Sequence, residues 1–375
     1  KNFLLITITI DYIVPYGSDA LKMKGLQNFE QQLLRDDLIK WFEKNKRDLP
    51  WRKTKDPYAI WVSEIMLQQT KVETVINYYN KFMKNYPTIF HLAEAEEQDV
   101  LKNWEGLGYY SRARNLHAAV KEVVATYGGE VPNDVKKLGE LKGIGPYTKG
   151  AIMSIAFNQP EPAVDGNVMR VLSRILLIKE NIMEQKTRRL FEEIVRELIS
   201  KENPSAFNQA LMELGALICI PRSPRCEQCP VQPYCRANNN GMEKELPVRI
   251  AKTKLKTKEY ISVCLFDEKG KVALEQRDAE GLLANMWQFP MIEKDSVINR
   301  PLVELFKEKY GIEISVMKKL GNVQHVFSHL IWKIVVQEAK VEKIAKMNNG
   351  LVFVRVNELQ NYPIATAHQK MMKLM

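Results

Sequence analysis

The sequence lacks a hydrophobic run long enough to cross a membrane. The apolar stretch near its start, Phe3–Ile10, has eight residues, whereas a membrane-spanning helix needs about 20. The stretch is similar to the core of a signal peptide, but only Lys1 precedes it and no convincing cleavage site follows. We therefore predict no membrane partner, and we predict that residues 1–22 are an extension outside the fold.

Cysteine is also scarce, because the 375 residues include only five. Four of them lie within one short stretch, and the fifth, Cys264, lies in an apolar segment that is typical of a buried strand. This pattern argues against the disulfide framework of a small secreted domain. Clustered reduced thiols are in keeping with a cytoplasmic protein.

The four clustered cysteines are spaced C-x6-C-x2-C-x5-C and can converge on one metal centre. Zinc sites usually consist of two C-x2-C pairs separated by a dozen or more residues, and only one such pair is present. An all-thiolate set suits an iron–sulfur cluster at least as well. From the spacing alone we favour a cluster over zinc, with both left open. The candidate ligands are Cys219, Cys226, Cys229 and Cys235.

The length and charge of the chain predict two domains and a polyanionic partner. Lysine and arginine outnumber the acidic residues by 55 to 45, giving a net charge of +10, which favours nucleic acid. Apolar residues recur at helical spacing from about 29 to 215, and strand-like segments follow the cysteines. We predict an all-α domain over 23–245, a basic linker over 246–258 and an α+β domain over 259–375.

A glycine-containing turn and two carboxylates are the strongest candidates for chemistry. In Leu141–Thr148, Gly143 and Gly145 allow close approach of a partner, and the amides of the following helix can bind a phosphate. This arrangement is typical of a helix-hairpin-helix that holds DNA. Glu64 shares a helix face with apolar side chains, which would keep it protonated as a general acid. Asp165 precedes a helix, whose N-terminus would favour an anion.

Together, a protonated Glu and an ionised Asp suit cleavage of a glycosidic bond. Each has a simpler structural interpretation, since Glu64 alone could face solvent and Asp165 alone could be only a helix N-cap. These motifs, with Leu49–Arg52, Ser63–Thr70 and Gly106–Leu116, resemble the iron–sulfur branch of the DNA glycosylase superfamily, and within it the MutY-type adenine DNA glycosylases. The resemblance runs from about residue 29 to the C-terminus and implies a [4Fe-4S] cluster at the cysteines.

The resemblance implies a base-excision repair enzyme that removes adenine paired with 8-oxoguanine or guanine in duplex DNA after flipping the base out of the helix. Glu64 would protonate adenine and Asp165 would stabilise the sugar cation, supported by Tyr147 and Asn167. The other implied residues are the adenine pocket of Trp51, Arg52, Leu67 and Gln209, and the DNA contacts of Gln69, Tyr109, Gly143, Gly145 and Thr148. A monomer acting in the bacterial cytoplasm at the nucleoid, with enzymes that process abasic sites downstream, is expected.

Position 147 distinguishes branches of the superfamily. Relatives that also cut the strand carry a lysine there, which forms a Schiff base with the sugar. The tyrosine here predicts a monofunctional glycosylase, against the alternatives of an endonuclease III-like lyase or a DNA-binding protein without activity.

The last domain resembles a Nudix domain. Only Glu308 keeps its place in the metal-binding motif, so a nucleotide hydrolase is disfavoured. The Phe-Ser-His loop of the family is present as Phe327, Ser328 and His329, which would recognise 8-oxoguanine.

Overall fold

The computed structural model describes residues 28–250, 255–344 and 350–375. These residues form two compact units, one of 28–47 and 158–250 and the other of 48–157 with the C-terminal part. The helical region predicted as one domain is therefore divided between both units. The predicted extension over residues 1–22 lies outside the described residues. None of the helices in the described part of the chain has the length and apolar character needed to cross a bilayer.

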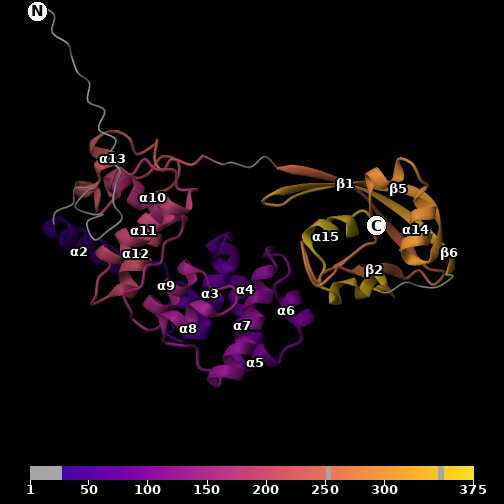
Figure 1. Cartoon of the computed structure of the whole chain (residues 1–375), viewed down its shortest axis with the longest axis horizontal. Helices are drawn as coiled ribbons and strands as arrows, with labels where there is room; N and C mark the ends of the chain where they lie inside the picture. The colour runs from indigo at the N-terminus through magenta and orange to yellow at the C-terminus, as the bar shows by residue number, and fades with distance from the viewer. Residues whose placement is uncertain (1–27, 251–254, 345–349) are drawn as a thin grey trace, which may run out of the picture. The chain divides into compact units, whose positions relative to one another are not determined.

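The first unit is helical (Figure 1). Apolar residues at three- and four-residue spacing form its core, including the fully buried Leu34, Phe191 and Phe207. Asparagine and proline start the helix Pro204–Leu217, where the Asn203 side chain accepts a hydrogen bond from the Ala206 amide. Its elements are α2 (Asn28–Asn45), α10 (Gly166–Ile175), α11 (Gln185–Leu198), α12 (Pro204–Leu217), η2 (Cys226–Gln228), η3 (Gln232–Tyr234) and α13 (Arg236–Asn239).

The N-terminal part of the second unit is also helical. Asp56 caps α3 through the Tyr58 amide, and Asp134 caps α8 through two amides, as expected for these residues at helix starts. Its elements are η1 (Pro50–Arg52), α3 (Pro57–Leu67), α4 (Val72–Asn85), α5 (Ile89–Glu94), α6 (Glu97–Asn103), α7 (Ser111–Tyr127), α8 (Val135–Glu140) and α9 (Pro146–Ile155).

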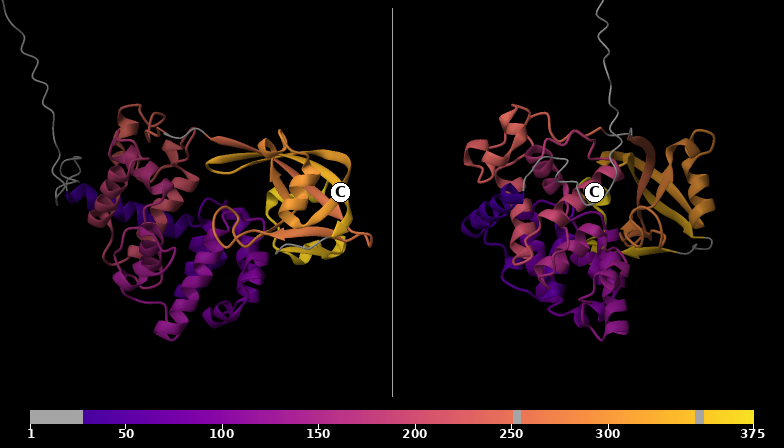
Figure 2. Two further views of the ribbon diagram at one scale, coloured as in Figure 1. Left: turned by 45° about the vertical axis from the view of Figure 1, so that its right-hand side comes forward. Right: turned by 60° about the vertical axis from the view of Figure 1, so that its left-hand side comes forward.

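The C-terminal part of the second unit is a seven-stranded sheet with helices against it (Figures 1 and 2). The main strand order is β3-β2-β1-β6-β5, with β4 pairing β1 and β7 pairing β2. Strands β1 and β6 are parallel, and β5 and β6 form a long antiparallel hairpin. The elements are β1 (Lys256–Phe266), β2 (Val272–Gln276), β3 (Trp287–Gln288), β4 (Met291–Glu293), η4 (Lys294–Val297), α14 (Leu302–Tyr310), β5 (Ile312–Val326), β6 (Leu330–Ile344), β7 (Leu351–Val354), η5 (Val356–Asn361) and α15 (Thr366–Met372).

The start of this sheet differs from the predicted boundary. β1 begins at Lys256, three residues before the predicted domain, because its first residues pair with β6 from Leu330 onward. Lysines 256 and 258 of the predicted linker thus belong to a strand. Cys264 is fully buried, which confirms the interpretation of this cysteine as a core residue.

Candidate active site

Glu64 lies in the interior of the second unit. It belongs to α3, of which nine residues are buried, and only 5% of Glu64 is exposed. Ile60 and Trp61, on the same helix face, are also buried, so the prediction of an apolar setting is confirmed and the solvent-facing alternative is wrong. The hydroxyl of Tyr147 donates a hydrogen bond of 2.6 Å to Glu64 Oε2. The tyrosine that replaces the lysine of strand-cutting relatives thus contacts the candidate acid.

The helix-hairpin-helix consists of α8, the turn 141–145 and α9. Gly143 has a φ of +81° and a Cβ there would lie 2.7 Å from the side chain of Asn115, so this position requires glycine. At Gly145 a Cβ would meet nothing within 4 Å, which leaves the turn open to a ligand. Thr148 is 2% exposed and its hydroxyl accepts a bond from Gln68. The predicted DNA contact of Thr148 is therefore assigned to its main-chain amide in the first turn of α9 rather than to its side chain.

Asp165 caps α10 in the first unit. Its Oδ1 accepts a bond of 2.8 Å from the Val168 amide, and its Oδ2 accepts a bond of 2.7 Å from the Asn167 side chain. Burial raises the pKa of Asp165, while these two bonds lower it. The sequence predicts that the helix N-terminus favours the anion. The hydrogen bonds act in that direction and agree with this part of the prediction, whereas burial has the larger effect and leaves the pKa above its ordinary value.

A chain of hydrogen bonds links Asp165 to the cysteine loop within the same unit. Asn167 Oδ1 accepts a 2.8 Å bond from Arg170, and Arg170 Nε donates over 2.8 Å to the main-chain oxygen of Cys219. Arg174, one turn further along α10, donates to Cys219 Sγ over 3.3 Å and to the Ile220 carbonyl over 2.8 Å. The helix that carries the candidate catalytic carboxylate thus also holds the first cysteine of the loop.

The chemistry and position of the cysteines fit an iron–sulfur cluster. All four thiols line one pocket between α10, the end of α12 and the loop, although no three acidic, histidine or cysteine side chains of the described residues are placed to hold a single metal ion. Four cysteines are the ligand set of a [4Fe-4S] cluster. Burial raises the pKa of Cys229 to about 12, a barrier to ionisation that iron binding would overcome.

Two loops of the second unit each contain a non-glycine residue with left-handed backbone geometry. Gln69 and Tyr109 have φ values of 56° and 49°, and both are exposed. The buried guanidinium of Arg112 holds the two loops together, because it donates to the Gln68 carbonyl over 2.6 Å and to the Gly108 carbonyl over 3.0 Å. It also lies 5.6 Å from the centre of the Tyr109 ring. Gln69 and Tyr109, two of the predicted DNA contacts, are therefore held on loops that Arg112 fixes to one another.

The Phe-Ser-His loop forms the tip of the β5–β6 hairpin and lines a cavity with Tyr109. The cavity has a volume of about 410 Å³ and is lined by Gly106, Gly108–Ser111, Arg114, Gly281–Leu283, His325–His329 and Ala365–Ala367. Ser328 and His329 are exposed, whereas the ring of Phe327 packs 4.9 Å from that of Trp332. The structure thus brings the predicted lesion-reading residues together with Tyr109, although Phe327 is partly engaged in the core of the sheet.

The predicted adenine-pocket residues lie in both units. Trp51 is buried and its ring lies 5.4 Å from that of Tyr79, while Arg52 and Leu67 are half-buried. Gln209 belongs to α12 of the first unit, and its amide donates to Ser205.

Sequence reasoning missed three arginines that act through their guanidinium groups: the buried Arg112 and Arg174 and the half-buried Arg170. Arg170 and Arg174 are four residues apart directly after Asn167. This spacing places both arginines on one face of a helix, and it is the feature of the sequence that could have identified them.

Comparisons with known proteins define the class. Residues 62–197 match the HhH-GPD superfamily base excision DNA repair protein model, residues 219–235 match the iron–sulfur binding domain of endonuclease III, and residues 262–374 match the NUDIX domain. A solved thermostable thymine-DNA glycosylase is 29% identical and covers 57% of this chain and 98% of its own, with a TM-score of 0.52. The chain is a helix-hairpin-helix DNA glycosylase with a cluster loop and a C-terminal Nudix domain.

The particular family follows from relatives that match most of this chain. The chain is 37% identical to the adenine DNA glycosylase of Arabidopsis thaliana over 82% of its own length and 57% of that protein. It is 34% identical to the adenine DNA glycosylase of Rattus norvegicus over 91% and 77% of the two chains. The chain belongs to the adenine DNA glycosylases, hydrolases of N-glycosyl bonds in base-excision repair, and its cofactor is a [4Fe-4S] cluster.

Proposed function

We propose that this protein removes adenine paired with 8-oxoguanine or guanine in duplex DNA and leaves an abasic site. The main support is the Glu64–Tyr147 contact, since a buried carboxyl with a phenol in place of a lysine suits an acid-catalysed glycosylase without lyase activity. We expect the protein to act as a monomer in the cytoplasm at the nucleoid and to hand its product to enzymes that process abasic sites.

In the proposed reaction, adenine is flipped out of the duplex, and we assign its binding to Trp51, Arg52, Leu67 and Gln209. Glu64 donates a proton to N7, the bond between C1′ and N9 breaks, and adenine leaves. The ionised Asp165, oriented by Asn167, stabilises the cationic sugar. Water then adds to C1′, and its proton returns to a carboxylate.

The [4Fe-4S] cluster would be held by Cys219, Cys226, Cys229 and Cys235, and it would supply a rigid support for the loop. The chain's own part in this arrangement is carried by Arg170 and Arg174, which fix the loop to α10. The catalytic steps are assigned to Glu64 and Asp165.

The second part of the proposal is recognition of 8-oxoguanine, which lies in the DNA strand opposite the adenine. 8-Oxoguanine differs from guanine by an N7–H donor and an O8 acceptor, so a hydroxyl or imidazole at the base edge can distinguish them. Ser328 and His329 are exposed beside Tyr109. We assign them to the reading of the lesion, with Gln69 and Tyr109 entering the base stack. A volume of about 410 Å³ falls within the usual range of small-molecule sites, roughly 300–1,000 Å³.

One assay tests this function directly. The protein is incubated with duplexes that contain adenine opposite 8-oxoguanine, adenine opposite guanine, or thymine glycol, and base release is followed in single-turnover conditions. Fastest adenine release from the first duplex supports the proposal, and release of thymine glycol alone contradicts it. Efficient trapping of the DNA on borohydride reduction would instead indicate a lyase.

A further inference from the structure

Within the second unit, the loop that displays Tyr109 is tied to the C-terminal domain through Glu105. This residue follows α6 and immediately precedes Gly106. Its side chain is 15% exposed, so most of its carboxylate lies away from water. A carboxylate in such a position needs donors for its lone pairs.

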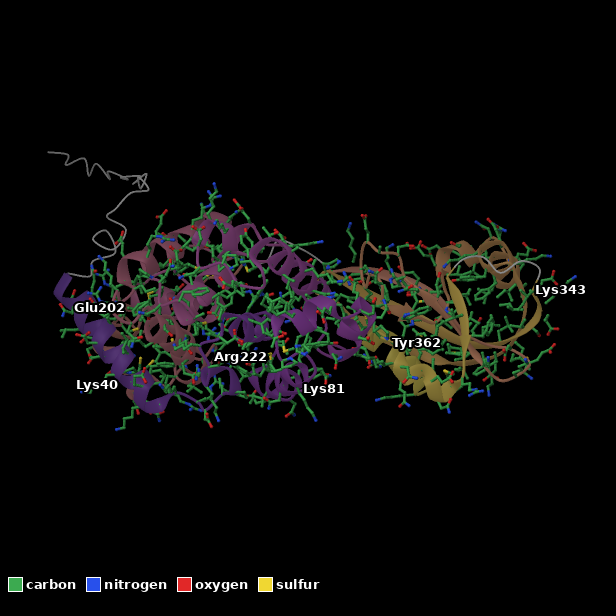
Figure 3. All side chains as sticks on the ribbon, turned by 90° about the horizontal axis from the view of Figure 1, so that it is seen from below. Lys40, Lys81, Glu202, Arg222, Lys343 and Tyr362 are labelled. Carbon is green, nitrogen blue, oxygen red and sulfur yellow. The ribbon has the colours of Figure 1, made fainter. Side chains whose placement is uncertain are left out.

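The donors to Glu105 come from both domains. Oε1 accepts a bond of 3.2 Å from the Ile364 amide and one of 2.6 Å from the side-chain amide of Gln369. Oε2 pairs with the ammonium group of Lys102, which also donates over 3.1 Å to the Tyr362 carbonyl. Glu105 therefore connects the end of α6 to the segment 362–369. Tyr362 is labelled in Figure 3, where its segment lies beside the helices of the same unit.

The two connected segments form walls of the same cavity. Gly106, Gly108 and Tyr109 line one side, and residues 365–367 line it together with the tip of the β5–β6 hairpin. The main-chain amide of Gly106 donates to the hydroxyl of Tyr110, so the loop after Glu105 is itself held. A shift at Glu105 would change the distance between Tyr109 and the residues that read the lesion.

Docking of the domains does not depend on Glu105 alone. Gln98 accepts a bond of 3.0 Å from the Trp287 indole and donates over 3.1 Å to the Asn285 carbonyl. Arg114 donates over 2.7 Å to the carbonyl of Ala284. Removal of the Glu105 carboxylate should thus alter the cavity while the domains remain docked.

We propose that Glu105 is a positioning residue that fixes the Tyr109 loop against the Phe327–His329 hairpin tip and thereby sets the preference for 8-oxoguanine over guanine opposite adenine. This inference rests on the proposed function. Glu105 touches neither the adenine nor the opposite base. It acts through the segments it joins, and the predicted consequence of its loss is poorer discrimination.

The test compares the single-turnover rates of adenine release from the two mispairs. In Glu105→Ala, the rate ratio of the 8-oxoguanine duplex to the guanine duplex should fall at least about tenfold, because the donors of Ile364 and Gln369, on either side of the wall residues 365–367, lose a charged acceptor. Glu105→Gln, which keeps one acceptor oxygen, should restore part of the ratio. Glu122→Ala, at an exposed site on α7, is the matched control and should leave the ratio unchanged.

Two further measurements separate positioning from general destabilisation. Amide exchange at Ile364 should be faster in Glu105→Ala, whereas the melting temperature and the rate with the guanine duplex should change little. Gln369→Ala should lower the ratio as well, and the double variant should lose less than the sum of the two single effects.

The outcomes distinguish this inference from the proposed function. If the unaltered protein releases no adenine from either duplex, the proposed function and the inference are both overturned. If it prefers 8-oxoguanine and Glu105→Ala keeps the same ratio, only the inference is overturned. Equal losses with both duplexes would also overturn it, since Glu105 would then support folding or catalysis rather than discrimination.

Discussion

The two candidate catalytic carboxylates are held in different ways. Glu64 lies in the middle of a helix among apolar residues, and a phenol hydroxyl contacts it. Asp165 lies at the start of a helix, where the main-chain amide of Val168 and the side-chain amide of Asn167 each donate a hydrogen bond to one of its oxygens. Exclusion of water favours the neutral form of both groups, and at Asp165 hydrogen bonds from two amides oppose this effect and hold the carboxylate in one orientation. The comparison explains how two carboxyl groups can serve opposite roles in one reaction.

The largest effect is expected from Glu64→Gln. Glutamine can still accept the bond from Tyr147 but cannot transfer a proton, so adenine release should slow by about 10²–10⁴-fold. Single-turnover rates measure this change, and binding to the mispaired duplex should be retained. Glu94→Gln, at an exposed site on α5, is the control. Unaltered base release in Glu64→Gln would assign the protonation of adenine to another group.

Arg170→Ala tests the hydrogen bonds that connect Asp165, through Asn167, to the cysteine loop. It removes donors to Asn167 and to the Cys219 carbonyl, so base release should slow by about ten- to hundredfold, as expected for lost bonds to a charged group. The visible absorbance of the cluster should also decay faster in air. Arg189→Ala, at an exposed position of α11, should change neither measurement. A slower rate with an unchanged cluster would limit the role of Arg170 to Asn167.

Tyr147→Phe tests the hydrogen bond to Glu64, and we expect a smaller effect than for Glu64→Gln. The variant keeps the ring and removes the hydroxyl that donates to Glu64, so base release should slow by up to about tenfold. The pH dependence of the single-turnover rate should shift, since the donated bond favours the ionised form of Glu64. A rate loss as large as that of Glu64→Gln would instead show that the hydroxyl takes part in proton transfer.

The sequence predicted the features that depend on local chemistry. The periodicity before Gly215, the hairpin turn at Gly143 and the cysteine spacing each depend on neighbouring residues, and the corresponding helices and loop are present. The burial of Glu64 followed from its apolar helix face in the same way. These are short-range patterns, which a single sequence records directly.

The contacts between distant segments could not be predicted from one sequence. Glu105 and Gln369 are 264 residues apart, and Arg112 contacts carbonyls of a loop more than 40 residues away. Asp165 also illustrates the difficulty, because the amides at its helix start were predictable but the burial that outweighs them depends on how the chain packs. The division of the helical region between two units also depends on contacts between segments that are far apart in the sequence.

The smallest expected effect is on the melting temperature, and it compares two helix N-caps, Asp165 and Asp134. Burial raises the pKa of Asp165 above its ordinary value of 3.8, so the folded protein binds this proton more tightly than the unfolded chain. Its contribution to stability is present below the ordinary value and is lost as pH rises through the raised one. Asp165→Asn keeps a good N-cap and removes the buried charge. We expect a higher melting temperature at neutral pH, with the difference shrinking toward pH 4.

Asp134 is the matched control with the opposite sign. Hydrogen bonds from main-chain amides, most of all that of Lys137, lower the pKa of this exposed N-cap. Its contribution to stability is therefore present above the ordinary pKa and is lost as the pH falls through the lowered pKa. Asp134→Asn should therefore lower the melting temperature at neutral pH. If thermal unfolding showed the same sign for both variants, loss of charge could not be the cause, and the helix caps themselves would account for the change.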